Sequence, residues 1–126
     1  MNCPIAGRLC REEVSVAMAM SLGTFQDRLR LWSARAAHEV ENSAGEIAES
    51  WRGQQRVLAA IASYMEGDGA LYTPAALRLR LIEDRESARR VWEATVNKRE
   101  VSFHAGEVAA YDLVLDVLKG IGAQWD

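Results

Sequence analysis

Apolar residues in this sequence recur at steps of three and four positions, which is the spacing of side chains along one face of an α-helix. One such stripe runs through Phe25, Leu29, Trp32, Ala36 and Val40. Alternation of apolar and polar residues, which is typical of a half-buried strand, is everywhere too brief to predict one. The sequence is therefore predicted to be all-α.

Further stripes of the same period predict further helices. They run through Ile47, Trp51, Leu58, Ile61 and Met65, through Leu77, Leu81, Ala88, Val91, Trp92 and Thr95, and through Val108, Tyr111, Leu115 and Leu118. We expect a small antiparallel bundle of four to six helices. Its two main hairpins are expected to join at Gly67–Tyr72, where two closely spaced glycines predict a turn.

Start and stop signals place most of the helix boundaries. Thr73 followed by Pro74 is a strong start signal, because threonine caps a helix and proline suits its first position. A first helix is expected from about Leu9 to Ser21, with Gly23 in the place of a C-terminal cap. Thr24 is then the expected cap of the next helix.

Two boundaries stay open in the sequence. The run Asn42–Glu46 can end one helix and start another, with Ser43 and Glu46 as a capping box, or it can kink a single helix. A slip in the phase of the apolar stripe favours the break. At Asn97–Ser102 the polarity rises, and Ser102 is the expected cap of the last helix.

The length of 126 residues fits one domain. Residues 1–8 are expected to form a short N-terminal arm and residues 120–126 a C-terminal tail. The segment Ala44-Gly45-Glu46-Ile47-Ala48 resembles Ala105-Gly106-Glu107-Val108-Ala109. This echo is either the trace of a duplicated hairpin or a coincidence in an alanine-rich chain.

Charge and cysteine use bear on the compartment and on the class of partner. The net charge of −3 disfavours a general nucleic-acid binder, whose affinity comes mostly from neutralising phosphates. Cys3 and Cys10 lack the paired spacing of a zinc site. A disulfide between them would cross-link only a tail, so we expect free thiols in a reducing compartment. No apolar run is long enough to span a membrane, and Glu12 and Glu13 precede the segment 14–22, where a signal peptide would be basic. The sequence predicts a cytoplasmic protein without membrane contact.

Motifs for catalysis are missing from the sequence. No Gly-x-Ser-x-Gly, P-loop or Gly-x-Gly-x-x-Gly occurs, so we predict no enzyme and no cofactor. His104 and Glu107 share a helix face and, together with His38, could form part of a metal site. The Glu-x-x-His order of metal-binding bundles is absent, so we interpret His104 as a helix-start histidine near solvent. We interpret Asp112 and Asp116 as part of a solvated face.

Arginines between positions 78 and 90 form the most concentrated basic feature. They are Arg78, Arg80, Arg85, Arg89 and Arg90. Guanidinium groups can hold phosphate or a partner's carboxylates. The alternative is a solvated face with ion pairs along the helix, such as Glu86 with Arg90. The chain is acidic from Glu100 onward, and these opposite charges could satisfy each other within one chain or guide two copies into a dimer.

Tryptophans supply both expected core residues and an expected contact. Trp32, Trp51 and Trp92 lie on apolar stripes and are predicted to be in the core. Trp125 lies beyond the last helix. It is either an exposed interface anchor or a residue folded back onto the bundle.

The leading functional prediction is a non-enzymatic protein-binding domain that acts by occluding a partner protein. Inhibitors and adaptors, such as immunity proteins and phage anti-defence proteins, are of this kind. The predicted contact residues are Arg78, Arg85, Arg89, Arg90 and Trp125. A homodimer is also compatible with the sequence. The alternatives are nucleic-acid binding through the Arg78–Arg90 helix and a metal-binding bundle around His38, His104 and Glu107.

Overall fold

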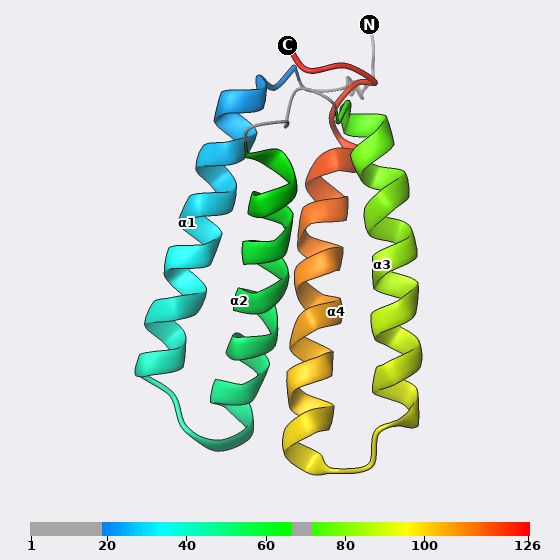
Figure 1. Ribbon diagram of the computed structural model, residues 1–126. Helices are drawn as coiled ribbons and strands as arrows, with labels where there is room; N and C mark the ends of the chain where they lie inside the picture. The colour runs from blue at the N-terminus through cyan, green and yellow to red at the C-terminus, as the bar shows by residue number, and fades with distance from the viewer. Residues whose placement is uncertain (1–18, 67–71) are drawn as a thin grey trace, which may run out of the picture.

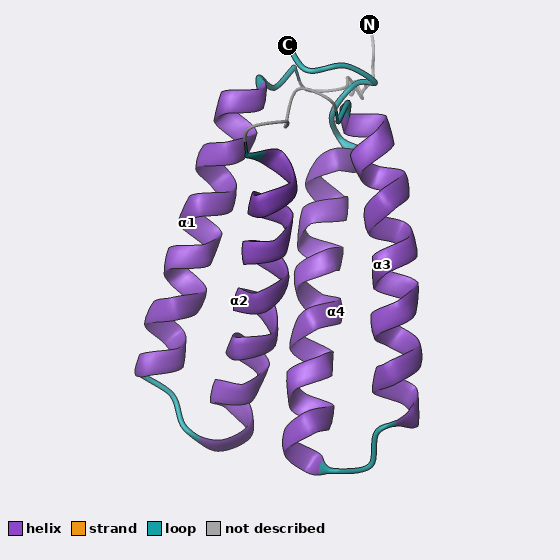
Figure 2. Ribbon diagram, viewed as in Figure 1, coloured by secondary structure: helices purple, strands orange, loops and turns teal. Residues whose placement is uncertain are grey.

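The structure is a computed structural model that describes residues 19–66 and 72–126. These residues form four helices and no strand (Figures 1 and 2). The helices are α1 (Leu22–Glu41), α2 (Gly45–Met65), α3 (Pro74–Ala94) and α4 (Lys98–Lys119). The all-α prediction is therefore confirmed for this part of the chain.

The helices lie roughly side by side in the order α1, α2, α4, α3 (Figure 1). Helices α1 and α2 run antiparallel, as do α3 and α4. The central pair, α2 and α4, runs in the same direction and has the most extensive contact of any two helices. The expected junction at Gly67–Tyr72 falls almost wholly on residues 67–71, which lie outside the described residues.

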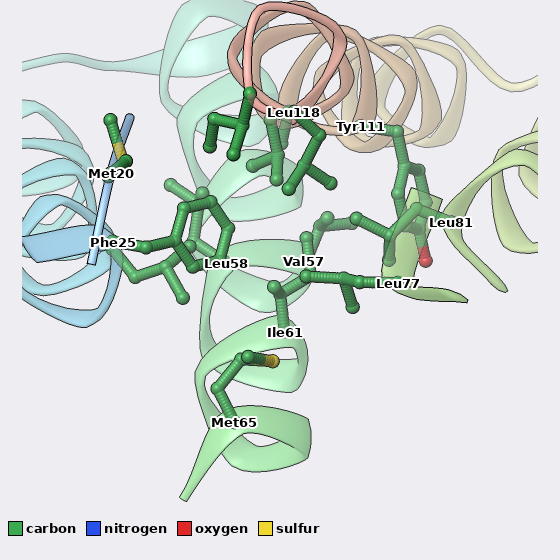
Figure 3. Packing of buried hydrophobic residues seen from close by; sticks show 14 of the residues in the cluster. Met20, Phe25, Val57, Leu58, Ile61, Met65, Leu77, Leu81, Tyr111 and Leu118 are labelled. Atoms are coloured by element: carbon green, nitrogen blue, oxygen red, sulfur yellow. The ribbon is translucent and has the colours of Figure 1, made fainter. Parts of the chain in front are cut away.

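The large buried side chains gather in one half of the bundle. They come from the first halves of α1 and α3 and from the second halves of α2 and α4. Figure 3 shows this packing around Phe25, Leu58, Ile61, Leu81 and Leu118. Burying each such side chain stabilises the fold by roughly 1.5–3 kcal/mol relative to leaving it exposed. This half of the molecule therefore holds the four helices together.

Two glycines set the closest approach of α2 and α4. A Cβ atom at Gly53 would overlap the carbonyl oxygen of Phe103, and one at Gly106 would overlap the carbonyl oxygen of Ser50. Only glycine, which has no Cβ atom, allows two helix backbones to approach this closely. Gly45, the other glycine of the sequence echo, begins α2 with a φ of 62° instead. The two echoing segments therefore occupy unlike places in the fold.

The predicted boundary at Gly23 and Thr24 is wrong. Ser21 is the N-cap of α1, and its hydroxyl oxygen accepts a hydrogen bond from the backbone N–H of Thr24 at 3.1 Å. Gly23 and Thr24 therefore lie in the first turn of α1. The backbone N–H of Thr24 would otherwise have no partner there, and Ser21 provides one. The first helix expected up to Ser21 does not reach it, because residues 19–21 are not helical, and residues 9–18 lie outside the described part.

Two further predicted boundaries are present in the structure, one without a side-chain cap and one with it. The break within Asn42–Glu46 is confirmed, but α2 starts after Ala44, and no side chain caps it. The expected capping box of Ser43 with Glu46 is therefore wrong. The start at Thr73 is confirmed, since its hydroxyl oxygen accepts from the N–H of Ala76 at 3.1 Å.

Helix α4 begins four residues before the predicted cap, so the prediction of Ser102 is also wrong. The side-chain oxygen of Asn97 accepts from the N–H of Arg99 at 3.0 Å and from that of Glu100 at 3.2 Å. One asparagine thus satisfies two free amides of the first turn. His104 therefore lies well inside α4, which corrects its interpretation as a helix-start histidine.

Replacing Asn97 with alanine is expected to lower the free energy of unfolding by about 1 kcal/mol, because the cap is lost. Replacing Ser102 with alanine is the matched control and should change stability by less than about 0.5 kcal/mol. Urea denaturation followed by circular dichroism measures both. A larger loss for the Ser102 variant than for the Asn97 variant would contradict this start of α4.

Some stripe residues are not in the core. Ile47 is 66% exposed and Val91 is 49% exposed, although both lie on apolar stripes of the sequence. Trp32, Trp51 and Trp92, which are predicted to be in the core, are only half-buried, and of these three Trp32 and Trp51 pack against the core. No helix of the described ranges combines the length and the apolar character that crossing a bilayer requires.

Candidate functional site

Two surface grooves flank α3 on opposite sides, and α4 completes both. We call the first the arginine groove, with a volume of about 430 Å³; its walls include Arg78, Ile82, Arg85, Asp112, Leu115 and Lys119. We call the second the polar groove, with a volume of about 410 Å³; α2 contributes to it, and its walls include Arg56, Tyr64, Asp84, Val91, His104 and Glu107. Both volumes fall in the range of ligand pockets.

Three of the four arginines predicted as contacts follow one stripe along α3. Arg78, Ile82, Arg85 and Arg89 are separated by steps of four, three and four residues, so they share a face of the helix. Ile82 is 47% exposed on this stripe. Arg90 is one residue out of phase and lies on the exposed side of α3.

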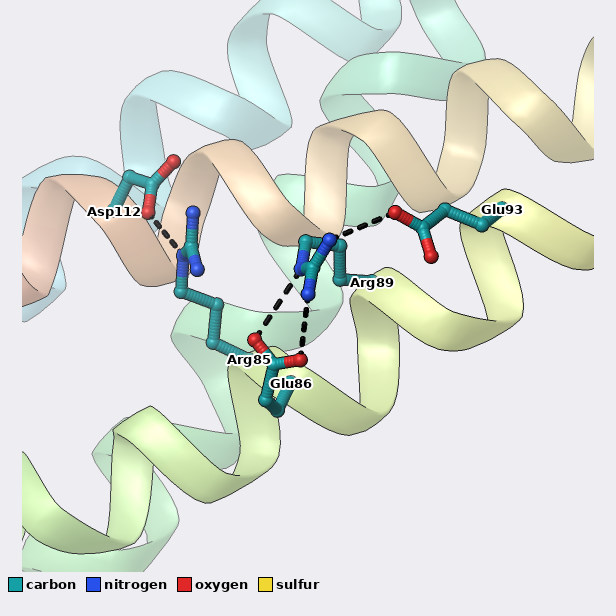
Figure 4. A network of polar contacts seen from close by, with 5 residues as sticks. All are labelled: Arg85, Glu86, Arg89, Glu93 and Asp112. Atoms are coloured by element: carbon teal, nitrogen blue, oxygen red, sulfur yellow. Dashed lines mark hydrogen bonds and ion pairs between the residues drawn. The ribbon is translucent and has the colours of Figure 1, made fainter.

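Two arginines of the stripe have partners within the chain (Figure 4). Arg85 on α3 donates from Nε to the carboxylate of Asp112 on α4. Arg89 forms ion pairs with Glu86 and Glu93 on its own helix, each at 2.7 Å. The hydrogen bond from Arg89 lowers the pKa of the Glu86 carboxyl. The predicted pair of Glu86 with Arg90 is wrong, because Glu86 pairs with Arg89 instead.

The pair of Arg85 with Asp112 bears on the charge asymmetry of the sequence. It joins a basic side chain of α3 to an acidic side chain of α4 inside one chain. Opposite charges therefore satisfy each other at this point without a second copy. Arg78 and Lys119, in contrast, form no ion pair with any residue that the structure describes.

Arg80 lies apart from the stripe. Its guanidinium carbon is 4.4 Å from the ring centroid of Tyr64, and its Nε lies 3.4 Å from a carboxylate oxygen of Asp84. It also donates to the hydroxyl of Tyr72 at 3.1 Å. The arginines of α3 therefore do not form a single basic face.

Trp125 folds back onto the bundle. Its indole N–H donates to the backbone carbonyl of Tyr72 at 2.6 Å, and its ring centroid lies 5.1 Å from that of Phe25. The side chain is half-buried against the core. The structure therefore places Trp125 near the start of α3 and not among the residues that line the arginine groove.

A buried carboxylate lies in the wall of the polar groove. Glu107 is 5% exposed. One of its oxygens accepts from Nε of Arg56 on α2, and the other lies 2.6 Å from Nδ1 of His104. Burial lowers the pKa of Arg56, but the hydrogen bond and charge of Glu107 outweigh this effect, so that the pKa of Arg56 is raised. Burial raises the pKa of the Tyr111 phenol, which also lines this groove.

The structure brings together only part of the metal site considered from the sequence. His104 and Glu107 do contact each other, as their spacing allows. His38 is exposed near the end of α1, beside Asn42. Within residues 19–66 and 72–126, no three histidine, cysteine, aspartate or glutamate side chains are grouped so that they could hold a metal ion.

Arg56, Tyr64 and Asp84 are site residues that the sequence reasoning missed. One available signal was the phase of Glu107, which precedes Tyr111 by four residues on the buried stripe of α4. A carboxylate in phase with core residues needs a charged partner, because an isolated buried charge is costly. That signal predicts a partner but does not say which residue it is.

Comparison with known proteins gives no relative. The chain matches no family model, no curated protein and no solved structure.

Proposed function

We propose that this protein is a non-enzymatic protein-binding domain, of the inhibitor or adaptor kind, that binds an acidic segment of a partner protein in the arginine groove. The observation that carries the proposal is the exposed Ile82 beside Leu115, with Arg78, Arg85 and Lys119 around them. An apolar floor with cations at its rim suits an apolar side chain flanked by carboxylates. Occlusion of the partner's own surface would be its mode of action.

The charges at the groove favour a carboxylate as the polar part of the partner. The described residues leave Arg78 and Lys119 without an ion pair. A guanidinium can hold a carboxylate through two parallel hydrogen bonds. The groove accommodates only a few side chains, so a stable contact of about 800 Å² per partner would also include Leu79 and Arg90 on the exposed side of α3.

Nucleic-acid binding through the same helix is less favoured. The arginine groove also contains the carboxylates of Glu86, Asp112 and Asp116, so its lining lacks the excess of cations that a phosphate backbone requires. Arg85 and Arg89 are already paired with acidic side chains. Sequence-independent binding of nucleic acid needs several free cations along the phosphate backbone, whereas a single carboxylate of a partner needs only one.

The proposal takes residues 1–126 as one domain of two helical hairpins. It places the protein in the cytoplasm, where Cys3 and Cys10 are expected to be free thiols. A dimer of two copies is the competing assembly. Light scattering on the purified protein distinguishes the two, since the proposal expects the mass of a monomer.

The proposal is tested by measuring how tightly a charge-reversed variant of the groove binds a partner that has been purified from the host. The double variant Arg78→Glu/Ile82→Asp is expected to weaken binding by about a hundredfold in calorimetry, because it replaces both the cation and the apolar contact. The matched control is Arg30→Glu/Leu31→Asp on α1, where Leu31 is 69% exposed and both residues lie away from α3.

The control variant should bind within about twofold of the unaltered protein, since it lies outside the contact. Equal weakening by both double variants would contradict the assignment of the groove. Retention of binding in an R78E/I82D protein would do the same. Salt-dependent binding of duplex DNA or RNA by the unaltered protein, lost in R78E/I82D, would replace the proposal with the nucleic-acid alternative.

A further inference from the structure

We propose that the polar groove is a second, separate site, which binds the oxyanion of a small molecule between Arg56 and His104. The oxyanion is a carboxylate or a phosphate. The two grooves lie on opposite flanks of α3 and share no lining residue. The site is thus independent of the partner contact proposed above.

The carboxylate of Glu107 orients both proposed ligand contacts. Of the Arg56 nitrogens, it engages Nε. The side chain also interacts with Tyr111, but it is 52% exposed, so part of the guanidinium is accessible from the groove. On the other side, it accepts from Nδ1 of His104, so Nε2 is the free ring nitrogen, and it donates to an oxyanion when the ring carries a proton on both nitrogens. One buried carboxylate therefore holds two hydrogen-bonding groups in place beside the groove before any ligand arrives.

The remaining acidic group of the groove is held by other partners. The carboxylate of Asp84 accepts from the hydroxyl of Tyr64 at 3.2 Å and lies 3.4 Å from Nε of Arg80. Its charge is therefore offset by a cation, as the charge of Glu107 is by Arg56. An oxyanion near Arg56 does not meet an uncompensated carboxylate.

The groove also offers room and an apolar wall for the body of the ligand. Its volume is about 410 Å³, and on the α3 side Ala88 and Val91 line it besides Asp84 and Ser87. Polar groups converging beside an apolar wall are the usual composition of a small-molecule site. Stability alone does not explain why Arg56 pairs with the buried Glu107. Apolar residues at such positions often stabilise a fold equally well.

Titration of the full-length protein with two probes, inorganic phosphate and benzoate, tests this site. The ¹⁵N signals of the Arg56 and His104 side chains and the amides around Ala88 should shift and saturate for at least one probe. Saturation by phosphate alone identifies a phosphate site, and saturation by benzoate alone identifies a carboxylate whose ring lies against Ala88 and Val91. No saturable shift at these residues with either probe would overturn the proposal.

Two variants separate binding from folding. Arg56→Gln should weaken probe binding by about tenfold or more, whereas Arg52→Gln, one turn earlier on α2 and also in an ion pair, should leave it unchanged. Val91→Trp should fill the groove and abolish binding without touching the ion pair, whereas Leu79→Trp, on the exposed side of α3, should not. Should Arg56→Gln fail to fold, the Val91 variant still decides: saturable binding that survives in V91W overturns the site.

Discussion

Replacing Gly106 with alanine is expected to lower the free energy of unfolding by about 3 kcal/mol or more. The added Cβ would overlap the backbone carbonyl of Ser50, and a backbone atom cannot rotate away as a side chain can. Helices α2 and α4 would have to separate, which would loosen their contact along the centre of the bundle. Chemical denaturation measures the loss, and Gly53→Ala should behave in the same way.

Gly23→Ala is the matched control for this prediction. Gly23 also lies inside a helix, but an added Cβ would meet only the Ser21 hydroxyl, at 4.0 Å. Alanine should therefore be tolerated in this first turn of α1 and should change stability by less than about 1 kcal/mol. The close contact of α2 with α4 is contradicted if Gly106→Ala is as stable as Gly23→Ala.

Removal of Arg56 is the second change with a large expected effect. Arg56→Met should destabilise the protein by about 2 kcal/mol, because Glu107 is left as a buried carboxylate without its cation. This value lies below the usual cost of breaking a buried pair, since Arg56 is half-exposed and His104 still contacts the carboxylate. Thermal and urea denaturation both report the change.

A double-mutant cycle shows that the loss comes from the uncompensated charge. Arg56→Met/Glu107→Gln should recover about half or more of the lost stability, because a neutral amide is cheaper to bury than a carboxylate. Arg52→Met is the control; it breaks an ion pair with Glu49 on the same helix and should cost under about 1 kcal/mol. Additive losses in the double variant would show that Glu107 does not depend on Arg56.

Several features of the fold are predictable because they depend on residues close in sequence. The apolar period around Phe25 and Leu29 predicts a helix, and Thr73 before Pro74 predicts the start of α3. Thr24 and Ser102 are wrong as caps because Ser21 and Asn97 cap the same helices earlier. Any of several polar residues can serve as a cap, so the choice among them depends on where the helix first packs.

The site is predictable only where it is local. His104 and Glu107 are three residues apart, so their contact follows from helix geometry. Arg56 joins Glu107 across 51 positions of sequence, and no local pattern specifies that partner. The exposure of Ile82 is likewise hidden in the sequence, because it depends on how far α4 covers the flank of α3.

The sequence also predicts only in part which acidic residues the arginines of α3 pair with. The sequence predicts pairs along α3, and Arg89 does form two of them. Arg85 instead reaches Asp112 on the neighbouring helix. Spacing allows several partners for each arginine, and the packing of α3 on α4 selects among them.

Methyl NMR of the domain in a purified complex with its partner tests the central claim, that the arginine groove binds an acidic protein segment. The methyl signals of Ile82 and Leu115 should shift and show intermolecular contacts to the partner. The exposed methyl groups of Leu31 and Ile47, on α1 and α2, are internal controls and should stay unchanged. Shifts at Leu31 or Ile47 with Ile82 and Leu115 unaffected would contradict the account.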